Sequence, residues 1–312
     1  MALLAAGLLA GCAGSDENEI PGADRQPILL NAGIQQITEG TRATTFDNAT
    51  ALQTERSFTC VAYNANTTTE YISPTTVNWN STTSQWEFNS GASHYYWPLP
   101  STPGGTYPAL DFFAYMPNEA NKPNYIGSLE YTVDHNVTFS CENLPNSATG
   151  QTSTHEFVYD VATGRNKTNS GVSGVTLTFR HPFARIRMRW AEYDHSEITS
   201  LTIKLKNIKN NGSYNKDASP QWTPSGDNTD FTVTTLDAND ADPLTNYLVV
   251  PQDWTGEIEV TASWNDWGDT PVAHTLTATV PTEWLPGNSY TYTFRITPED
   301  LTVDTSGYTE QW

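Results

Sequence analysis

Residues 175–190 read VTLTFRHPFARIRMRW, in which apolar and polar side chains alternate in two phases. The odd positions are apolar before His181, and the even positions are apolar after Pro182. Alternation with a period of two is typical of β-strands that bury one face. One extra residue at His181–Pro182 would exchange the two faces, as a β-bulge does. We therefore expect a strand with a bulge, whose apolar members are Val175, Leu177, Phe179, Ala184, Ile186, Met188 and Trp190.

The same alternation recurs along the chain, and no stretch keeps a helical period over three turns. Thr, Tyr, Val and Trp favour strands, while Gly and Pro recur between the alternating segments. The sequence therefore predicts an all-β protein. The other expected strands are residues 28–37, 58–64, 75–80, 110–117, 131–141, 198–208, 246–254, 257–264, 274–281 and 289–297.

The chain has 312 residues, which is enough for two domains. Residues 143–174 are rich in Ser, Thr, Asn and Gly, and EFVYDVA (156–162) is the one apolar island among them. Such a composition is typical of loops and linkers. We place a boundary near residue 170, which gives an N-terminal domain of residues 43–170 and a C-terminal domain of residues 171–312.

The chain holds 15 basic and 35 acidic residues, for a net charge of −20 at pH 7. Such a chain repels nucleic-acid backbones and anionic membrane surfaces, so we expect neither as a partner of its surface. Aromatic residues make up 12% of the chain and include ten Trp. They can fill large cores, which argues against a disordered protein.

The first twelve residues, MALLAAGLLAGC, form an apolar run that is too short to span a bilayer and has the length of a signal peptide. Residues 9–12 (LAGC) have the lipobox pattern, in which the thiol of Cys12 carries a diacylglycerol; the alternative is an ordinary signal peptide with a chance cysteine. The following AGSDENE resembles the acidic export signal of lipoproteins on the outer face of certain Gram-negative outer membranes; the alternative is a solvated linker. We expect lipidation at Cys12 and a place at the cell surface.

The sequence lacks the common catalytic signatures HExxH, GxSxG, P-loop and paired CxxC. The six histidines stand singly, and nothing points to the paired carboxylates that a glycosidase needs. Asp237, Asp240 and Asp242 cluster in one segment, but without the turn glycine and distal glutamate of an EF-hand, so a solvated loop is preferred to a Ca²⁺ site. We predict no metal, no cofactor and no enzymatic activity.

Arg185, Arg187 and Arg189 alternate along one face of the segment quoted above, with Arg180 nearby. Guanidinium groups suit carboxylates, so one interpretation is a site for an anion or an acidic sugar. The other is an exposed sheet face whose arginines pair with nearby Asp and Glu. We prefer the second interpretation.

Five other side chains also allow two interpretations. Tyr95, Tyr96 and Trp97 could stack on sugar rings or could fill a core, and we prefer the core. Cys60 and Cys141 both lie in strand-like segments. An exported chain could oxidise them to a disulfide, or they could be two buried thiols that never meet. The sequence leaves this choice open, because it does not place the two Cα atoms within bonding reach.

Several stretches taken in order resemble the fimbrillin-like family, the lipoprotein precursors of type V pilus subunits. They are YYWPLP (95–100) with LDFFAYMP (110–117), EFVYDVA with VTLTFRHPFARIRM, NYLVVPQ (246–252), and WLPGNSYTYTFRIT (284–297) before a terminal tail. With the lipobox and Arg42 they cover the chain end to end, and their order carries the resemblance.

The resemblance implies two β-sandwich domains of transthyretin-like type, an extended C-terminal tail, and assembly by donor-strand exchange. In the family, a lipidated precursor reaches the surface with its first strand docked in its own N-terminal domain. An arginine-specific protease then cuts after an arginine beyond that strand. Removal of the strand leaves an apolar groove with unpaired backbone groups, which an extended tail of another subunit fills. Repetition of this contact gives a filament.

Mapped onto this chain, the resemblance makes residues 13–42 a propeptide of acidic linker and first strand. The polar loop after the strand places the cut between Arg42 and Ala43, because exposed loops are cleaved in preference to strands. A change of parity late in the strand allows a bulge near Gly33. The apolar members of the removable strand are Ile28, Leu30, Ile34 and Ile37.

The donor candidate is residues 300–312, in which Gly307 weakens the strand. The implied function is a structural or adhesive subunit of a type V fimbrium, as stalk or tip. Its partners would be other fimbrial subunits, the protease, and a host or bacterial surface glycan or protein. The rival hypothesis is an uncut, glycan-binding surface lipoprotein that uses Tyr95, Tyr96 and Trp97. The apolar members of the donor candidate are Leu301, Val303, Tyr308 and Trp312.

Overall fold

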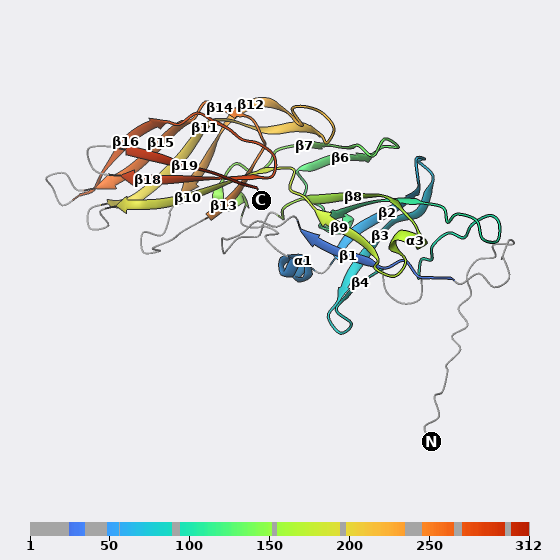
Figure 1. Cartoon of the computed structure of the whole chain (residues 1–312). Helices are drawn as coiled ribbons and strands as arrows, with labels where there is room; N and C mark the ends of the chain where they lie inside the picture. Colours follow the sequence, from blue (N-terminus) through green and yellow to red (C-terminus); the bar gives the residue numbers. More distant parts are fainter. Residues whose placement is uncertain are drawn as a thin grey trace, which may run out of the picture.

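A computed structural model describes residues 25–34, 49–55, 57–88, 94–151, 155–193, 198–234, 245–264, 270–296 and 301–311. Nearly all of the regular structure in these ranges is β-strand, which confirms the all-β prediction. The strands before residue 180 gather on one side of the molecule, and the later strands gather on the other (Figure 1).

The first sheet has seven strands, in the order β8-β5-β2-β3-β4-β1-β9. Neighbours are antiparallel except β1 and β9, which run parallel. The edge strands β8 and β9 approach each other at an isolated bridge between Tyr159 and Arg180, so the sheet curls around its core. The strands are β1 (Leu30–Ile34), β2 (Ser57–Asn64), β3 (Glu70–Asn80), β4 (Gln85–Phe88), β5 (Leu110–Met116), β8 (Val158–Arg165) and β9 (Val175–Phe179).

Successive residues of this sheet face two different apolar clusters, because side chains alternate across a strand. On β2, Cys60 faces one cluster, which we call the inner cluster, and Val61 faces the other, which we call the outer cluster. Strand β5 is buried on both faces, which explains its continuous apolar sequence. Prominent inner members are Leu30, Phe58, Trp86, Trp97, Phe112, Leu177 and Phe179, and prominent outer members are Phe113, Tyr159, Phe139, Phe183, Tyr214 and Trp222.

The segment 175–190 changes its apolar phase as predicted, but it is not one bulged strand. Residues 175, 177 and 179 are buried in the inner cluster, whereas residues 184, 186 and 188 are buried in a different, C-terminal cluster. Between them the chain leaves the seven-stranded sheet and enters another as β10 (Ala184–Tyr193). The bulge prediction was therefore wrong, because the change of phase marks a crossing between two sheets.

The second sheet joins the two halves of the sequence. Its order is β16-β15-β11-β7-β6, with β12 also paired to β11. One end of β11 pairs with β15, and its other end, residues 212–215, pairs with β7. The sheets therefore do not divide at residue 170, since β6 and β7 join the later strands and β9 joins the earlier ones. The strands are β6 (Ile126–Tyr131), β7 (Val137–Cys141), β11 (Ile198–Asn215), β12 (Trp222–Thr234), β15 (Glu257–Trp264) and β16 (Val272–Thr279).

The third sheet has the order β13-β10-β18-β19, with β13 (Thr245–Val249), β18 (Asn288–Ile296) and β19 (Leu301–Gln311). The C-terminal cluster is formed by this sheet together with β11, β12 and β15, and it includes Ile186, Ile203, Trp284 and Phe294. The pair β14 (Asp253–Trp254) and β17 (Thr282–Glu283) adds a small ribbon.

Helical segments are short: α1 (Ala49–Glu55), α2 (Ala148–Gln151), α3 (Lys167–Ser170) and the 3-10 turn η1 (Glu119–Asn121). Some strand predictions differ from the structure: residues 246–254 form two strands, β13 and β14, instead of one. Residues 131–141 are divided by a turn, in which the backbone of Asn136 accepts a hydrogen bond from Thr132 at 3.0 Å and His135 has φ 63°. Strand β12 was not expected.

Candidate functional site

The candidate site is the position of β1 in the seven-stranded sheet. Although it lies close to the N-terminus, β1 occupies an interior place between β4 and β9 (Figure 1). It pairs with β9 in continuous parallel register, from Leu30 opposite Val175 to Ile34 opposite Phe179. It meets β4 in antiparallel register, with Leu30 opposite Trp86. The register has no shift at Gly33, so the bulge that the sequence allowed there is absent from β1.

The side chains of this segment separate cleanly into two faces. Ile28, Leu30 and Ile34 are 4%, 3% and 6% exposed and belong to the inner cluster. Ala32 is half-buried against the same cluster, whereas Leu29 is 41% exposed. The predicted apolar face is thus the one that the structure buries, as far as Ile34.

Polar contacts fix the register of the segment. The backbone N–H of Ile28 donates to the carbonyl of Tyr95 at 2.7 Å, and the N–H of Val175 donates to the carbonyl of Leu29 at 2.8 Å. The amide Nδ2 of Asn31 donates to the carbonyl of Ser173 at 2.5 Å. These contacts would be lost if the strand slipped by one residue, and the apolar face would then point outward.

The position of Gly174, in the turn beside this strand, requires a glycine. Its φ is +77°, a conformation that L side chains rarely adopt. A Cβ at this position would also lie 2.9 Å from Nδ2 of Asn31 and 3.1 Å from the carbonyl oxygen of Leu29. The close approach of β1 to the turn before β9 therefore depends on this glycine, which the sequence analysis did not single out.

The aromatic run 95–97 is mainly core. Trp97 is 2% exposed and packs edge-on against Phe112, with ring centroids 6.1 Å apart. Tyr95 packs against the inner cluster, and Tyr96 is 37% exposed. Since a buried ring cannot stack on a sugar, the run does not form the three-ring platform that the glycan hypothesis needs.

Arg185 and Arg187 do not lie on an exposed face, so the preferred interpretation was wrong for these two arginines. Arg185 and Arg187 are 3% and 7% exposed, and Nε of Arg185 donates to the hydroxyl of Ser289 at 3.0 Å. On the neighbouring strand β13, Leu248 lies opposite Arg185, and its side chain belongs to the outer cluster. There Gln151 of α2 exchanges hydrogen bonds of 2.7 and 2.8 Å with the backbone of Leu248 on β13.

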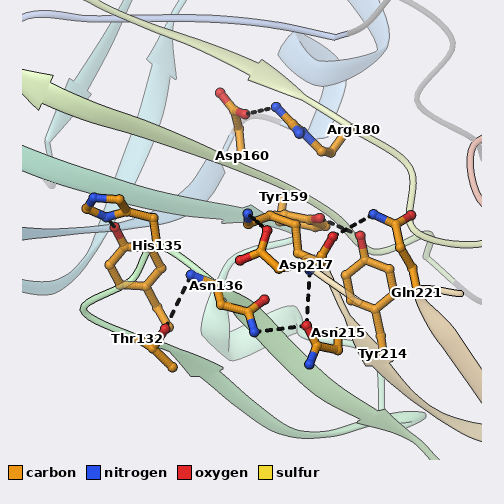
Figure 2. Close-up of polar contacts among 12 residues, drawn as sticks. Thr132, His135, Asn136, Tyr159, Asp160, Arg180, Tyr214, Asn215, Asp217 and Gln221 are labelled. Atoms are coloured by element: carbon orange, nitrogen blue, oxygen red, sulfur yellow. Dashed lines mark hydrogen bonds and ion pairs between the residues drawn. The ribbon is translucent and has the colours of Figure 1, made fainter. Parts of the chain in front are cut away.

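A polar network links β8, the crossing segment after β9 and the end of β11 (Figure 2). The carboxylate of Asp160 accepts from the guanidinium of Arg180 at 3.2 Å and from the backbone N–H of Thr178 at 2.7 Å. Burial raises the pKa of the Asp160 carboxyl, although both of these contacts oppose the shift. The hydroxyls of Tyr159 and Tyr214 lie 2.6 Å apart. This network holds the closing point of the seven-stranded sheet against β11.

Cys60 and Cys141 are free, buried thiols in different clusters, so the disulfide alternative is not formed. Cys60 faces the inner cluster from β2, and Cys141 faces the outer cluster from β7. Burial raises the pKa of each thiol to about 12. Both are therefore poor nucleophiles in the folded chain.

The C-terminal tail forms β19, an edge strand of the four-stranded sheet. It pairs antiparallel with β18 from Leu301 opposite Ile296 to Gln311 opposite Asn288. The register shifts opposite Tyr290, where Gly307 lies in the bulged part of β19. Val303 packs against the C-terminal cluster.

Several predicted residues lie outside the described ranges: Cys12, Ile37, Arg42, Ala43, Asp237, Asp240, Asp242 and Trp312. Within those ranges, no three His, Cys, Asp or Glu side chains gather closely enough to hold a metal ion. Of the histidines that the structure describes, His181 is buried, and its Nδ1 lies 2.6 Å from the carboxylate of Glu156. Among the residues described, no helix has the length and apolar character needed to cross a membrane.

Comparison with known proteins bears on most of the chain. A family model described as fimbrillin-like matches residues 41–312. No curated protein matches the chain. The part before residue 41, which contains β1, lies outside the family match.

Solved structures share the fold. A structure described as a cell adhesion protein from Bacteroides ovatus has a TM-score of 0.58 at 16% identity, over 93% of this chain and 99% of its own. A fimbrial protein from Bacteroides vulgatus has a TM-score of 0.56 at 14% identity, over 91% and 98%. At these identities the likeness establishes a common architecture.

Proposed function

This chain belongs to the fimbrillin-like family, and from that premise we propose that it is a structural or adhesive subunit of a cell-surface fimbrium. We propose that it is made as a lipoprotein precursor and activated by removal of β1. The observation that carries the proposal is the interior place of β1, a strand from the N-terminal end that completes a sheet of later strands.

Removal of β1 would leave a groove with strong affinity for another strand. Ile28, Leu30 and Ile34 would leave the inner cluster, and burial of each such side chain is worth roughly 1.5–3 kcal/mol. Backbone groups on β9 and near Tyr95 would lose their partners, the N–H of Val175 among them. An extended strand of another subunit would restore both kinds of contact by strand addition.

The proposed cut lies between Arg42 and Ala43, which follow β1 in the sequence. A cut there would release the segment that contains β1. Arg25 precedes β1, and a cut there would leave the strand in place. Cleavage beyond the strand is thus the event that permits its release.

We propose that the precursor is anchored through lipid on Cys12, and that the acidic residues behind it direct export to the cell surface. Two or more acyl chains suffice for stable anchoring. A cut after Arg42 would separate the body from the anchor as well as from β1. One cleavage would therefore both activate and release the subunit.

Limited digestion of the soluble form, without Cys12, tests the proposal. An arginine-specific protease should cut wild type and Arg25→Ala after Arg42 and leave Arg42→Ala with β1 attached, as mass spectrometry of the products would show. A labelled peptide of residues 26–36 should then bind the cut wild-type body and not uncut Arg42→Ala. If Arg42 resists the protease, or if the cut body takes no peptide, the proposal fails. Glycan binding by the uncut chain that is lost in Tyr96→Ala would favour the rival hypothesis instead.

A further inference from the structure

We propose that residues 300–312 of a second copy do not fill the β1 groove of this chain, and that its donor is a strand of a different subunit. The inference rests on the proposed function and concerns the β1 groove, which is the place of β1 between β4 and β9. It reverses the expectation that residues 300–312 are the donor. Two observations carry it: the side chains that the groove holds, and the sequence and position of the tail.

The β1 groove holds four inward side chains at alternate positions. Ile28, Leu30 and Ile34 are large and buried, and Ala32 between them is small and half-buried. Asn31 on the other face donates its amide hydrogen to the carbonyl of Ser173 at 2.5 Å. A strand that replaces β1 must therefore present large, large, small and large apolar groups, with a hydrogen-bond donor between the second and third.

The best alignment of the tail meets only half of this requirement. It places Leu301 and Val303 at the first two large positions and Thr305 at the small one. The last large position then receives Gly307, which would leave the place of the Ile34 side chain empty. Asp304 falls at the position of Asn31, and its carboxylate has no hydrogen to donate to the carbonyl of Ser173.

Other alignments are worse in either chain direction. Any four alternate residues between 300 and 312 include Gly307 or at least one of the carboxylates Asp304 and Glu310. The alignment that puts Gly307 at the small position puts Thr305 and Thr309 at large apolar ones. Burial of an unpaired carboxylate or hydroxyl is costly, so none of these alignments recovers the affinity of β1.

The tail also has a place in its own sheet. It lies antiparallel to β18, and the side chain of Val303 packs against the C-terminal cluster. If β19 were donated to another subunit, β18 would lose this partner and part of the C-terminal cluster would be exposed. The poor fit of residues 300–312 in the β1 groove would not compensate for this loss. We infer that β19 protects the edge of its own sheet. Residues 300–312 then do not link one copy of this chain to the next through the β1 groove.

A displacement assay on the cut body tests the inference. The body is first loaded with a labelled peptide of residues 26–36, and unlabelled peptides then compete for it. The competitors are residues 26–36, residues 300–312, the 300–312 peptide with Asp304→Asn and Gly307→Ile, and a control with Asp304→Asn and Ser306→Ile. The control carries the same new side chains, but its isoleucine falls on the outward face in the best alignment.

We expect the wild-type tail to compete roughly tenfold to a hundredfold less well than residues 26–36, as loss of one large buried side chain implies. The Gly307→Ile peptide should recover most of this deficit, and the Ser306→Ile control should not. A wild-type tail that competes as well as residues 26–36 would overturn the inference and leave the proposed function standing. If residues 26–36 themselves do not bind, the proposed function fails as well.

Discussion

Leu30→Ala should destabilise the uncut chain strongly. The Leu30 side chain is 3% exposed in the inner cluster, and its backbone is held between Val175 and Trp86 on the neighbouring strands. A leucine-to-alanine change in such a core costs about 2–5 kcal/mol. For about 3 kcal/mol, and about 2–4 °C per kcal/mol in a protein of this size, Tm should fall by roughly 6–12 °C.

The same substitution should have no effect after the proposed cleavage and release of β1. The wild-type and Leu30→Ala bodies then have the same sequence, so their Tm values should coincide in scanning calorimetry. Leu29→Ala is the matched control, because Leu29 is 41% exposed on the same strand, and it should change stability by less than about 0.5 kcal/mol. The reasoning would be refuted if Leu30→Ala and Leu29→Ala lowered the Tm of the uncut chain equally. It would also be refuted if the wild-type and Leu30→Ala bodies still differed in Tm after release of β1.

Three further predictions follow from buried groups. Because burial raises the pKa of Asp160, the folded chain binds that proton more tightly than the unfolded chain. Stability should therefore fall as pH rises from the ordinary aspartate range through the raised pKa, and urea unfolding of Asp160→Asn should lack this slope; an unchanged slope would contradict the assignment. Cys60 and Cys141 should resist alkylation in the native chain and react after unfolding, with no change of mass on reduction; native labelling would contradict their burial. Trp97→Ala should cost about 3–5 kcal/mol in urea unfolding and Tyr96→Ala far less; equal costs would contradict the core role of Trp97.

The strands could be predicted because alternation records which side chains are buried. Ile28, Leu30 and Ile34 were expected on the removable strand, and the structure buries all three on one face. The partner of that strand could not be predicted. Strand β9 lies far away in the sequence, and its parallel register depends on contacts of Asn31 and Gly174 that no local pattern reveals.

Two errors have a common physical origin. The phase change at His181–Pro182 was interpreted as a bulge, and the alternating Arg185 and Arg187 as an exposed face. Alternation distinguishes the two faces of a strand, but it does not show which sheet the strand joins or what covers its polar face. Here the chain changes sheet, and Arg185 and Arg187 are buried although they lie on the polar face of β10.

Hydrogen–deuterium exchange tests the central claim most directly. The amide of Val175 donates to the carbonyl of Leu29, so its protection reports whether β1 is docked. In the uncut chain this amide should exchange slowly. After the cut at Arg42 and release of β1 it should exchange fast, and a peptide of residues 26–36 should restore its protection. If peptides that cover β9 keep the same protection in all three states, β1 is not a removable strand and the account is contradicted.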